Sequence, residues 1–122
     1  MPQKEYVSWQ DLEDFANKLI EHYRDSNLTG VYGPARGGLI LAVIISNRMG
    51  IPMLAAPCKD CLIVDDICDT GESLVHYFKN SSSFDKPLYH IATMYYKEND
   101  LGVEPEYWGF SKEDKWIVFP WE

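Results

Sequence analysis

Apolar and polar positions along the chain follow spacings that predict helices and strands in alternation. Apolar residues recur every three or four positions over about residues 9–24, which is typical of an amphipathic helix, and Ser8 provides an N-cap. A second helix is expected over about residues 39–49, and because it is apolar on nearly all sides we expect it to be buried. A third helix is expected over about residues 73–80.

Short apolar runs between these helices predict strands at residues 28–33, 61–64, 89–95 and 116–119, with extended chain at 51–55. The run 61–64 is apolar throughout, as in the buried strands of a parallel sheet, and it is expected to stop at Asp65. The segment 98–115 is polar and aromatic, and no element is predicted in it. Strand, loop, helix and strand follow in this order, which predicts an α/β fold with a mainly parallel sheet flanked by helices. In such folds ligands bind beyond the carboxyl ends of the strands, so the polar loops there are the candidate sites.

Composition and charge narrow the class of protein. The chain has 122 residues, of which 46% are hydrophobic, so we expect one globular domain spanning residues 1–122. The net charge of -8 repels phosphate backbones, and we therefore expect no nucleic-acid partner. The longest nearly apolar run, residues 37–47, is too short for a membrane span, and the first residues do not resemble a signal peptide. A cytoplasmic location without membrane attachment is the resulting expectation.

The chain has three cysteines, Cys58, Cys61 and Cys68. An odd number without an export signal does not indicate a disulfide framework. Cys58 and Cys61 have the spacing of a redox or zinc pair, but one pair cannot complete a zinc site, and we interpret them as structural.

The stretch CLIVDDICDTGESL at residues 61–74 carries the most chemistry. Asp65 and Asp66 follow the apolar strand, and two adjacent carboxylates can accept hydrogen bonds from a vicinal diol or hold a hydrated Mg²⁺. The turn after them can surround an anion with backbone N–H groups and with the hydroxyls of Thr70 and Ser73, as in a monophosphate cradle. The lysine of a Walker A loop is absent, which argues against an ATPase or GTPase. Helix capping, or the Mg²⁺ site of a receiver-like domain, stays open as an alternative for the acidic pair.

The run VDDICDTGES resembles the phosphoribosyl pyrophosphate (PRPP) motif of type I phosphoribosyltransferases. The resemblance implies that Asp65 and Asp66 meet the ribose hydroxyls and Mg²⁺, and that Asp69 is the catalytic base near the nucleobase nitrogen. The 5′-phosphate would be held by Ile67, Cys68, Asp69, Thr70, Gly71, Glu72 and Ser73.

A second loop, GPARGGL at residues 33–39, lies at another junction of strand and helix. Paired glycines let backbone amides approach an anion closely, and a guanidinium supplies donors for phosphate oxygens. The loop is similar to the pyrophosphate loop of the xanthine-guanine branch of the same family. The resemblance implies that Ala35, Arg36, Gly37 and Gly38 bind pyrophosphate and that the peptide bond between Ala35 and Arg36 is cis. An ordinary glycine-rich turn is the alternative.

The ending KWIVFPWE at residues 115–122 resembles the base-binding segment of xanthine-guanine phosphoribosyltransferases. By this resemblance Trp116 stacks on a purine, the Ile117 carbonyl accepts from an exocyclic amine, Lys97 reads the 6-oxo group, and Glu122 helps to hold Mg²⁺. Core packing is the alternative for Trp116.

The resemblance implies a type I phosphoribosyltransferase fold with a minimal C-terminal hood and a Mg²⁺-dependent reaction. Phosphoribosyl would pass from PRPP to guanine, xanthine or hypoxanthine, giving the nucleoside 5′-monophosphate and pyrophosphate. Active members of the family carry a long mobile loop between the second and third strands that closes over PRPP, whereas here residues 51–61 lead almost directly into the acidic motif. A non-catalytic PRPP or nucleotide sensor is therefore the alternative function. A homo-oligomer, most simply a dimer, is expected.

Overall fold

Helices and strands alternate along the chain in the order that the pattern predicts. The computed structural model describes residues 3–34, 36–79 and 88–122. The elements in chain order are β1 (Lys4–Tyr6), α1 (Trp9–Tyr23), β2 (Val31–Tyr32), α2 (Gly37–Met49), β3 (Leu62–Cys68), α3 (Val75–Lys79), β4 (His90–Tyr96), β5 (Tyr107–Ser111) and β6 (Trp116–Val118).

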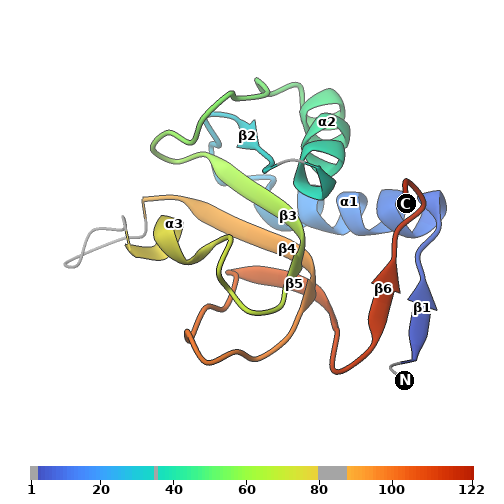
Figure 1. Cartoon of the computed structure of the whole chain (residues 1–122). Coiled ribbons are helices and arrows are strands. Elements are labelled where there is room, and N and C mark those ends of the chain that lie inside the picture. The colour runs from blue at the N-terminus through green and yellow to red at the C-terminus, as the bar shows by residue number, and fades with distance from the viewer. Residues whose placement is uncertain (1–2, 35, 80–87) are drawn as a thin grey trace.

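The strands form two parallel sheets (Figure 1). The main sheet has four strands in the order β2-β3-β4-β5, and Met53 extends it by a parallel bridge to Val31. The second sheet pairs β1 with β6, which lie side by side at the right of Figure 1, so the two ends of the chain meet there. These sheets and the flanking helices confirm the expected α/β class.

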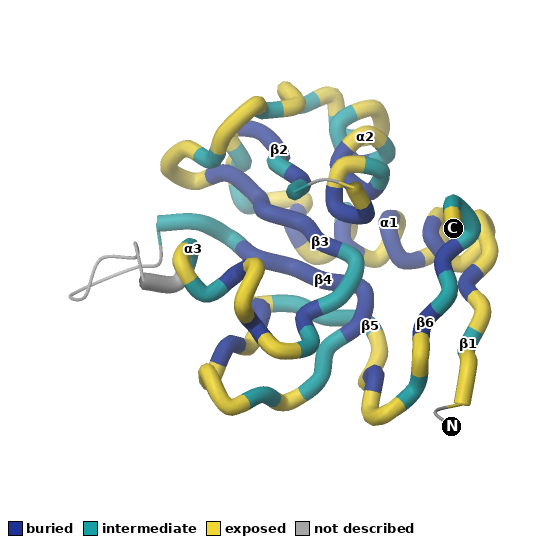
Figure 2. The backbone as a smooth tube through the Cα atoms, viewed as in Figure 1, coloured by how far each residue is buried: buried dark blue, intermediate teal, exposed yellow. Residues whose placement is uncertain are grey.

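Helices cover both faces of the main sheet. Because side chains alternate along a strand, Leu62 and Val64 of β3 join the core under α1 and α2, whereas Ile63 packs on the opposite face with Leu74, beside α3. Figure 2 shows β3 and β4 as the most buried part of the backbone, as expected for the two central strands. No helix in the described part of the chain is long and apolar enough to cross a membrane.

The ends of α1 and α2 follow from local chemistry. Ser8 Oγ accepts from Asp11 N at 3.0 Å and Asp11 Oδ2 accepts from Ser8 N at 2.9 Å, which is a complete capping box for α1. Gly50 ends α2 in the left-handed region at φ 68°, a conformation that costs glycine little. At its other end α2 begins at Gly37, earlier than expected, so the paired glycines Gly37 and Gly38 of the second loop lie in the first helical turn.

The structure corrects four expectations about the strands and the third helix. β3 does not stop before Asp65 but runs to Cys68, because β4 continues to pair with it as far as Tyr96. β5 lies within the segment where no element was predicted, and β1 was likewise missed. The third helix begins only at Val75, and the end predicted for it at residue 80 lies outside the described residues.

Candidate functional site

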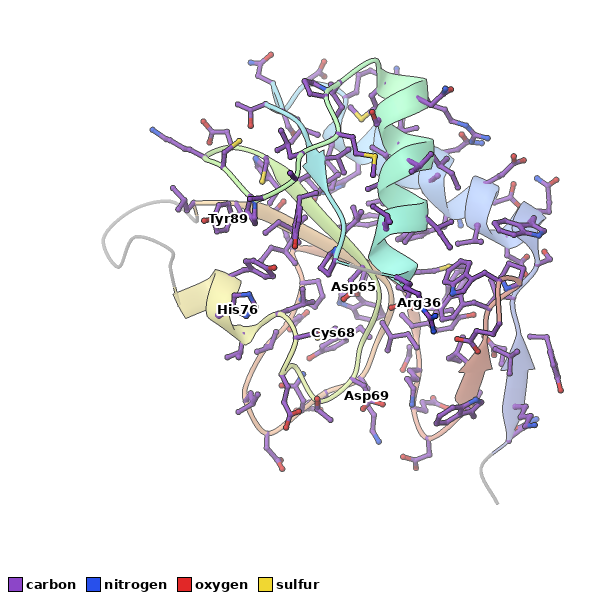
Figure 3. All side chains as sticks on the ribbon, turned by 45° about the horizontal axis from the view of Figure 1, so that its top comes forward. Arg36, Asp65, Cys68, Asp69, His76 and Tyr89 are labelled. Carbon is purple, nitrogen blue, oxygen red and sulfur yellow. The ribbon has the colours of Figure 1, made fainter. Side chains whose placement is uncertain are left out.

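The two loops singled out in the sequence lie against each other at the carboxyl end of β3. A Cβ built on Gly37 would overlap Asp66 Oδ2, and one built on Gly38 would lie 2.5 Å from the Val64 carbonyl oxygen and 3.2 Å from Asp65 Oδ1. Gly38 therefore leaves no room for a side chain against the backbone of β3, whereas a side chain at residue 37 would displace the Asp66 carboxylate. Figure 3 shows Arg36 and Asp65 near each other at this end of α2, with Asp69 further along the loop after β3.

Asp65 and Asp66 place two carboxyl groups side by side at the end of β3. The Asp65 side chain is only 8% exposed, and its Oδ1 accepts from Asp66 N at 2.8 Å, while Asp66 Oδ1 accepts from Ile67 N at 2.7 Å. Burial, and next the charge of Asp66, raise the pKa of Asp65 above its ordinary range. Among the described residues neither carboxylate has an ion-pair partner. The pair is thus suited to a cation or to hydroxyl donors from a ligand.

This raised pKa makes the stability of the ligand-free protein dependent on pH. As the pH rises above 3.8, the ordinary value, Asp65 ionises in the unfolded chain but stays protonated in the folded chain, so the folded state binds more protons. We expect the free energy of unfolding to fall by about 1.4 kcal/mol for each pH unit by which the folded pKa exceeds the unfolded one. Asp65→Asn cannot ionise and should remove this part of the pH dependence.

Urea unfolding at about pH 5 and about pH 8 measures the difference between the two proteins. Asp25→Asn, at an exposed carboxylate after α1, is the control and should keep the pH dependence of the unchanged chain. Equal pH dependence in Asp65→Asn and the unchanged chain would contradict the prediction.

A hollow of about 320 Å³ joins the loop after β3 to the C-terminal strand. Its lining residues are Ile67, Asp69, Thr70, Gly71, Ser73, Lys112, Trp116, Ile117 and Glu122. Trp116 is 58% exposed, so the core-packing alternative for this side chain is wrong. The structure thus brings residues expected to bind a phosphate and residues expected to bind a purine into one cavity.

The loop after β3 is shaped by a turn and not by a long helix. Gly71 has φ 84°, and its carbonyl accepts from Val75 N at 2.8 Å, which leads directly into α3. A Cβ at Gly71 would lie 3.0 Å from Asn99 Oδ1 and from the Val103 side chain, so the segment after β4 packs closely on this loop. Since α3 spans only Val75–Lys79, we assign any anion binding here to the turn and its hydroxyls.

Asp69 has a partner that sequence analysis did not find. Lys112 Nζ lies 2.9 Å from Asp69 Oδ2, and the Lys112 side chain is only 11% exposed. The lysine directly follows β5, and its backbone N–H donates to the Tyr96 carbonyl at 2.8 Å. The local sequence does not predict that Lys112 is buried, because the surrounding residues SKEDK are typical of a solvated turn. Only the position of β5 beside β4 places the lysine here.

Lys97 does not line the same hollow as Trp116. It lines a neighbouring hollow of about 500 Å³, together with Asp69, Thr70 and Glu72. Its Nζ lies 3.1 Å from Asp114 Oδ1, and this hydrogen bond is the main cause of its raised pKa. Asp69 and Thr70 line both hollows, so they form the wall between them.

A third hollow, of about 400 Å³, lies at the start of α2 and is lined by Arg36, Gly37, Ile40, Asp66, Trp121 and Glu122. Glu122 also lines the Trp116 hollow, so the C-terminal residue borders both. Ala35, and with it the expected cis peptide bond to Arg36, lies outside the described residues. Within the described ranges no three His, Cys, Asp or Glu side chains gather as a metal site.

The cysteines take no part in these hollows. All three are free, Cys58 at the surface and the other two buried. Burial raises the pKa of the Cys68 thiol to about 11, so it is a poor nucleophile. Cys68 therefore packs beneath the loop after β3, while Ile67, Asp69, Thr70, Gly71 and Ser73 face the Trp116 hollow.

Comparison with known proteins identifies the family. No protein-family model matches the chain. The chain is 24% identical to a xanthine-guanine phosphoribosyltransferase of Chromohalobacter salexigens, over 95% of this chain and 82% of the relative. Its fold matches a purine phosphoribosyltransferase of Pyrococcus horikoshii with a TM-score of 0.81 and 31% identity, over 98% of this chain and 94% of that one. A Neisseria gonorrhoeae protein solved with bound ppGpp has the same fold, with a TM-score of 0.76 and 21% identity over 100% of this chain and 90% of its own. The paired loops, the acidic strand and these likenesses together establish that the chain belongs to the type I phosphoribosyltransferase family and is similar to its xanthine-guanine and purine members.

Proposed function

We propose that this chain transfers the phosphoribosyl group of PRPP to a 6-oxopurine, giving the nucleoside 5′-monophosphate and pyrophosphate. One observation carries the proposal. The hollow of about 320 Å³ is lined by Thr70, Gly71 and Ser73 of the turn after β3 and also by Asp69, Trp116 and Ile117. A phosphate-binding turn and an exposed aromatic platform in one cavity match the two ends of a purine nucleotide.

The acidic pair and Arg36 are proposed to bind the ribose and pyrophosphate end of PRPP. Breaking the bond to pyrophosphate leaves positive charge on the ribose and negative charge on the leaving group. Asp65 and Asp66 have no ion-pair partner in the described chain and are proposed to face the positive charge on the ribose, while Arg36, which lines the third hollow with Asp66, is proposed to bind the leaving pyrophosphate. Mg²⁺, when bound with PRPP, would neutralise pyrophosphate oxygens. Because no three protein ligands gather in the described residues, such an ion would be held mainly by substrate oxygens, with only one or two of the carboxylates Asp65, Asp66 and Glu122 beside them.

The base is proposed to lie between Trp116 and Asp69. Trp116 offers an exposed ring for stacking, and the Ile117 carbonyl can accept from an exocyclic amine. Asp69 lies on the wall of the same hollow and is proposed to take the proton of the attacking purine nitrogen. Lys97 is proposed to read the 6-oxo group from the neighbouring hollow that Asp69 and Thr70 share.

A nucleotide sensor without turnover is the second candidate. The observation in its favour is the short connection from α2 to β3, since only residues 50–61 separate Met49 from Leu62 and leave no room for a long lid. The length of the chain does not favour it, because the matched purine phosphoribosyltransferase of Pyrococcus horikoshii is covered over 94% of its own length. We therefore favour transfer over sensing.

An assay with PRPP and Mg²⁺ separates the two candidates. Guanine, xanthine, hypoxanthine and adenine are each incubated with the protein, and the nucleotide and pyrophosphate are quantified. Nucleotide formation from a 6-oxopurine, but not from adenine, is the expected result. Calorimetric binding of PRPP or GMP without any pyrophosphate release would establish the sensor and overturn the transferase.

Trp116→Ala is expected to weaken purine nucleotide binding by about 1–3 kcal/mol, or about 5- to 150-fold, because the stacking platform is lost. The side chain is mostly exposed, so the free energy of unfolding should change little. Calorimetry with GMP measures the affinity. Phe110→Ala, at an exposed aromatic of β5 outside the three site hollows, is the control and should bind as the unchanged chain does. Equal affinities of the two variants would contradict stacking on Trp116.

A further inference from the structure

Lys112 differs from the other ion-paired lysines of the described chain because its side chain is buried. Its side chain is 11% exposed, whereas those of Lys97 and Lys115 are 38% and 28% exposed. It is also the cation among the described residues that line the Trp116 hollow. Because this charged side chain is buried, it does not serve to keep the protein soluble, and its role must lie in the fold or in the proposed site.

Stability does not supply that explanation. Taking an ammonium group out of water is costly, and the attraction of one carboxylate often only offsets that cost. In other proteins, apolar side chains of similar volume often replace a buried ion pair without loss of stability. The backbone is already held by the hydrogen bond from Lys112 N to the Tyr96 carbonyl, and Lys115 N closes the turn by donating to the Lys112 carbonyl at 3.2 Å. Folding alone therefore does not account for the ion pair with Asp69.

The Asp69 carboxylate can face either of two hollows, and Lys112 lies on the side of the Trp116 hollow. The carboxylate lies on the wall between two hollows, with Lys112 and Trp116 in one and Lys97 in the other. Lys97 also attracts it, since the negative charge of Asp69 adds to that of Asp114 in raising the pKa of Lys97. Without Lys112, the attraction of Lys97 would remain and would draw the carboxylate toward the neighbouring hollow, away from Trp116.

We propose that Lys112 is a positioning residue, whose ion pair keeps the Asp69 carboxylate facing the hollow lined by Trp116 and Ile117. This inference rests on the proposed function, in which Asp69 acts on a purine nitrogen in that hollow. Correct orientation of a reacting group contributes much of an enzyme's rate enhancement, and a displacement of about 1 Å can lower the rate about 100-fold. Lys112 acts through Asp69 and need not contact the substrate.

Three variants test this role by kinetics. Lys112→Met removes the ammonium group but keeps an unbranched apolar stem, and Lys112→Arg keeps a cation. Arg48→Met is the control, because Arg48 also makes an ion pair, at 3.2 Å with Glu13, and lines none of the three site hollows. We expect Lys112→Met to lower kcat by about 10- to 100-fold with KM for PRPP changed less than about threefold. Lys112→Arg should recover most of the loss, and Arg48→Met should keep kcat within about twofold of the unchanged chain.

A double-mutant cycle with Asp69→Asn separates positioning from direct action. If Lys112 acts through the Asp69 carboxylate, Lys112→Met should change the residual rate of Asp69→Asn by less than about twofold. An equal loss in both backgrounds, or an effect confined to KM, would overturn the proposal and show that Lys112 acts on the substrate or on the fold.

Crystal structures of the unchanged chain and Lys112→Met provide a readout that needs no turnover. We expect the Asp69 carboxylate to face Trp116 in the unchanged chain and to turn toward Lys97 in the variant. The same orientation in both would overturn the positioning role. If the unchanged chain transfers phosphoribosyl to no base, the proposed function fails, and the orientation of Asp69 in the two structures still decides the role of Lys112.

Discussion

Asp69→Asn is expected to lower kcat for transfer to a 6-oxopurine by about 10²- to 10⁴-fold, the usual contribution of a general base. The amide has the same shape as the carboxylate but cannot take the proton of the purine nitrogen. The Asp69 side chain is 39% exposed, so the variant should fold. It leaves the buried ammonium of Lys112 with a neutral partner, and we expect a loss of stability of about 1–3 kcal/mol. Steady-state kinetics and urea unfolding on the same preparations measure both effects.

Asp25→Asn, which changes an exposed carboxylate after α1, is the control for this substitution and should keep kcat and stability. KM for PRPP should also change little in Asp69→Asn, because the phosphate turn and the acidic pair are intact. A kcat within about threefold of the unchanged chain would show that another group takes the proton.

Gly33→Ala is expected to disrupt the loop that carries Arg36. A Cβ at this position would overlap the Gly38 carbonyl and lie 2.8 Å from Leu39 N, and these backbone atoms belong to the first turn of α2. Because a helix backbone cannot yield as a side chain can, we expect a loss of about 1–3 kcal/mol or more in the free energy of unfolding. The displaced loop should also weaken PRPP binding by at least about tenfold, since oriented donors are lost.

Gly50→Asn provides the comparison for this glycine. A Cβ there meets nothing within 4 Å, and asparagine tolerates the left-handed conformation at φ 68°. We expect the free energy of unfolding of Gly50→Asn to lie within about 1 kcal/mol of that of the unchanged chain, and PRPP to bind both equally well. If Gly33→Ala behaves as Gly50→Asn does, the close approach of the loop to α2 is not required for binding.

Local patterns were sufficient for the elements that have a strong pattern of their own. α1 was found from its three- and four-residue spacing and its Ser8 cap, and α2 from its apolar run closed by Gly50. The two glycine-rich junctions were also found, because paired glycines and adjacent acids are unusual within a few positions. Fold class and family followed from these features.

What the sequence did not reveal depends on pairing between distant segments. The end of β3 was placed too early because the apolar pattern stops at Asp65, whereas the strand ends where β4 ceases to pair with it. β5 has no alternation of its own, since its burial is set by β4 on one side and by Phe15 against Gly109 on the other. Lys112 was missed for the same reason, because its burial depends on where β5 ends.

The half of the site that holds Trp116 and Ile117 is tied to the beginning of the chain, because in the described ranges β6 pairs with β1 and no other strand. Closing a loop that spans nearly the whole chain costs more conformational entropy than joining the successive strands of the main sheet, so contacts of this kind form late in folding. Each strand of this sheet has only three residues, so we expect local unfolding to open it more readily than the central strands β3 and β4. A ligand that bridges Trp116 and the turn after β3 binds only when β1 and β6 are paired, so occupancy of the site should keep the two chain ends together and slow their opening.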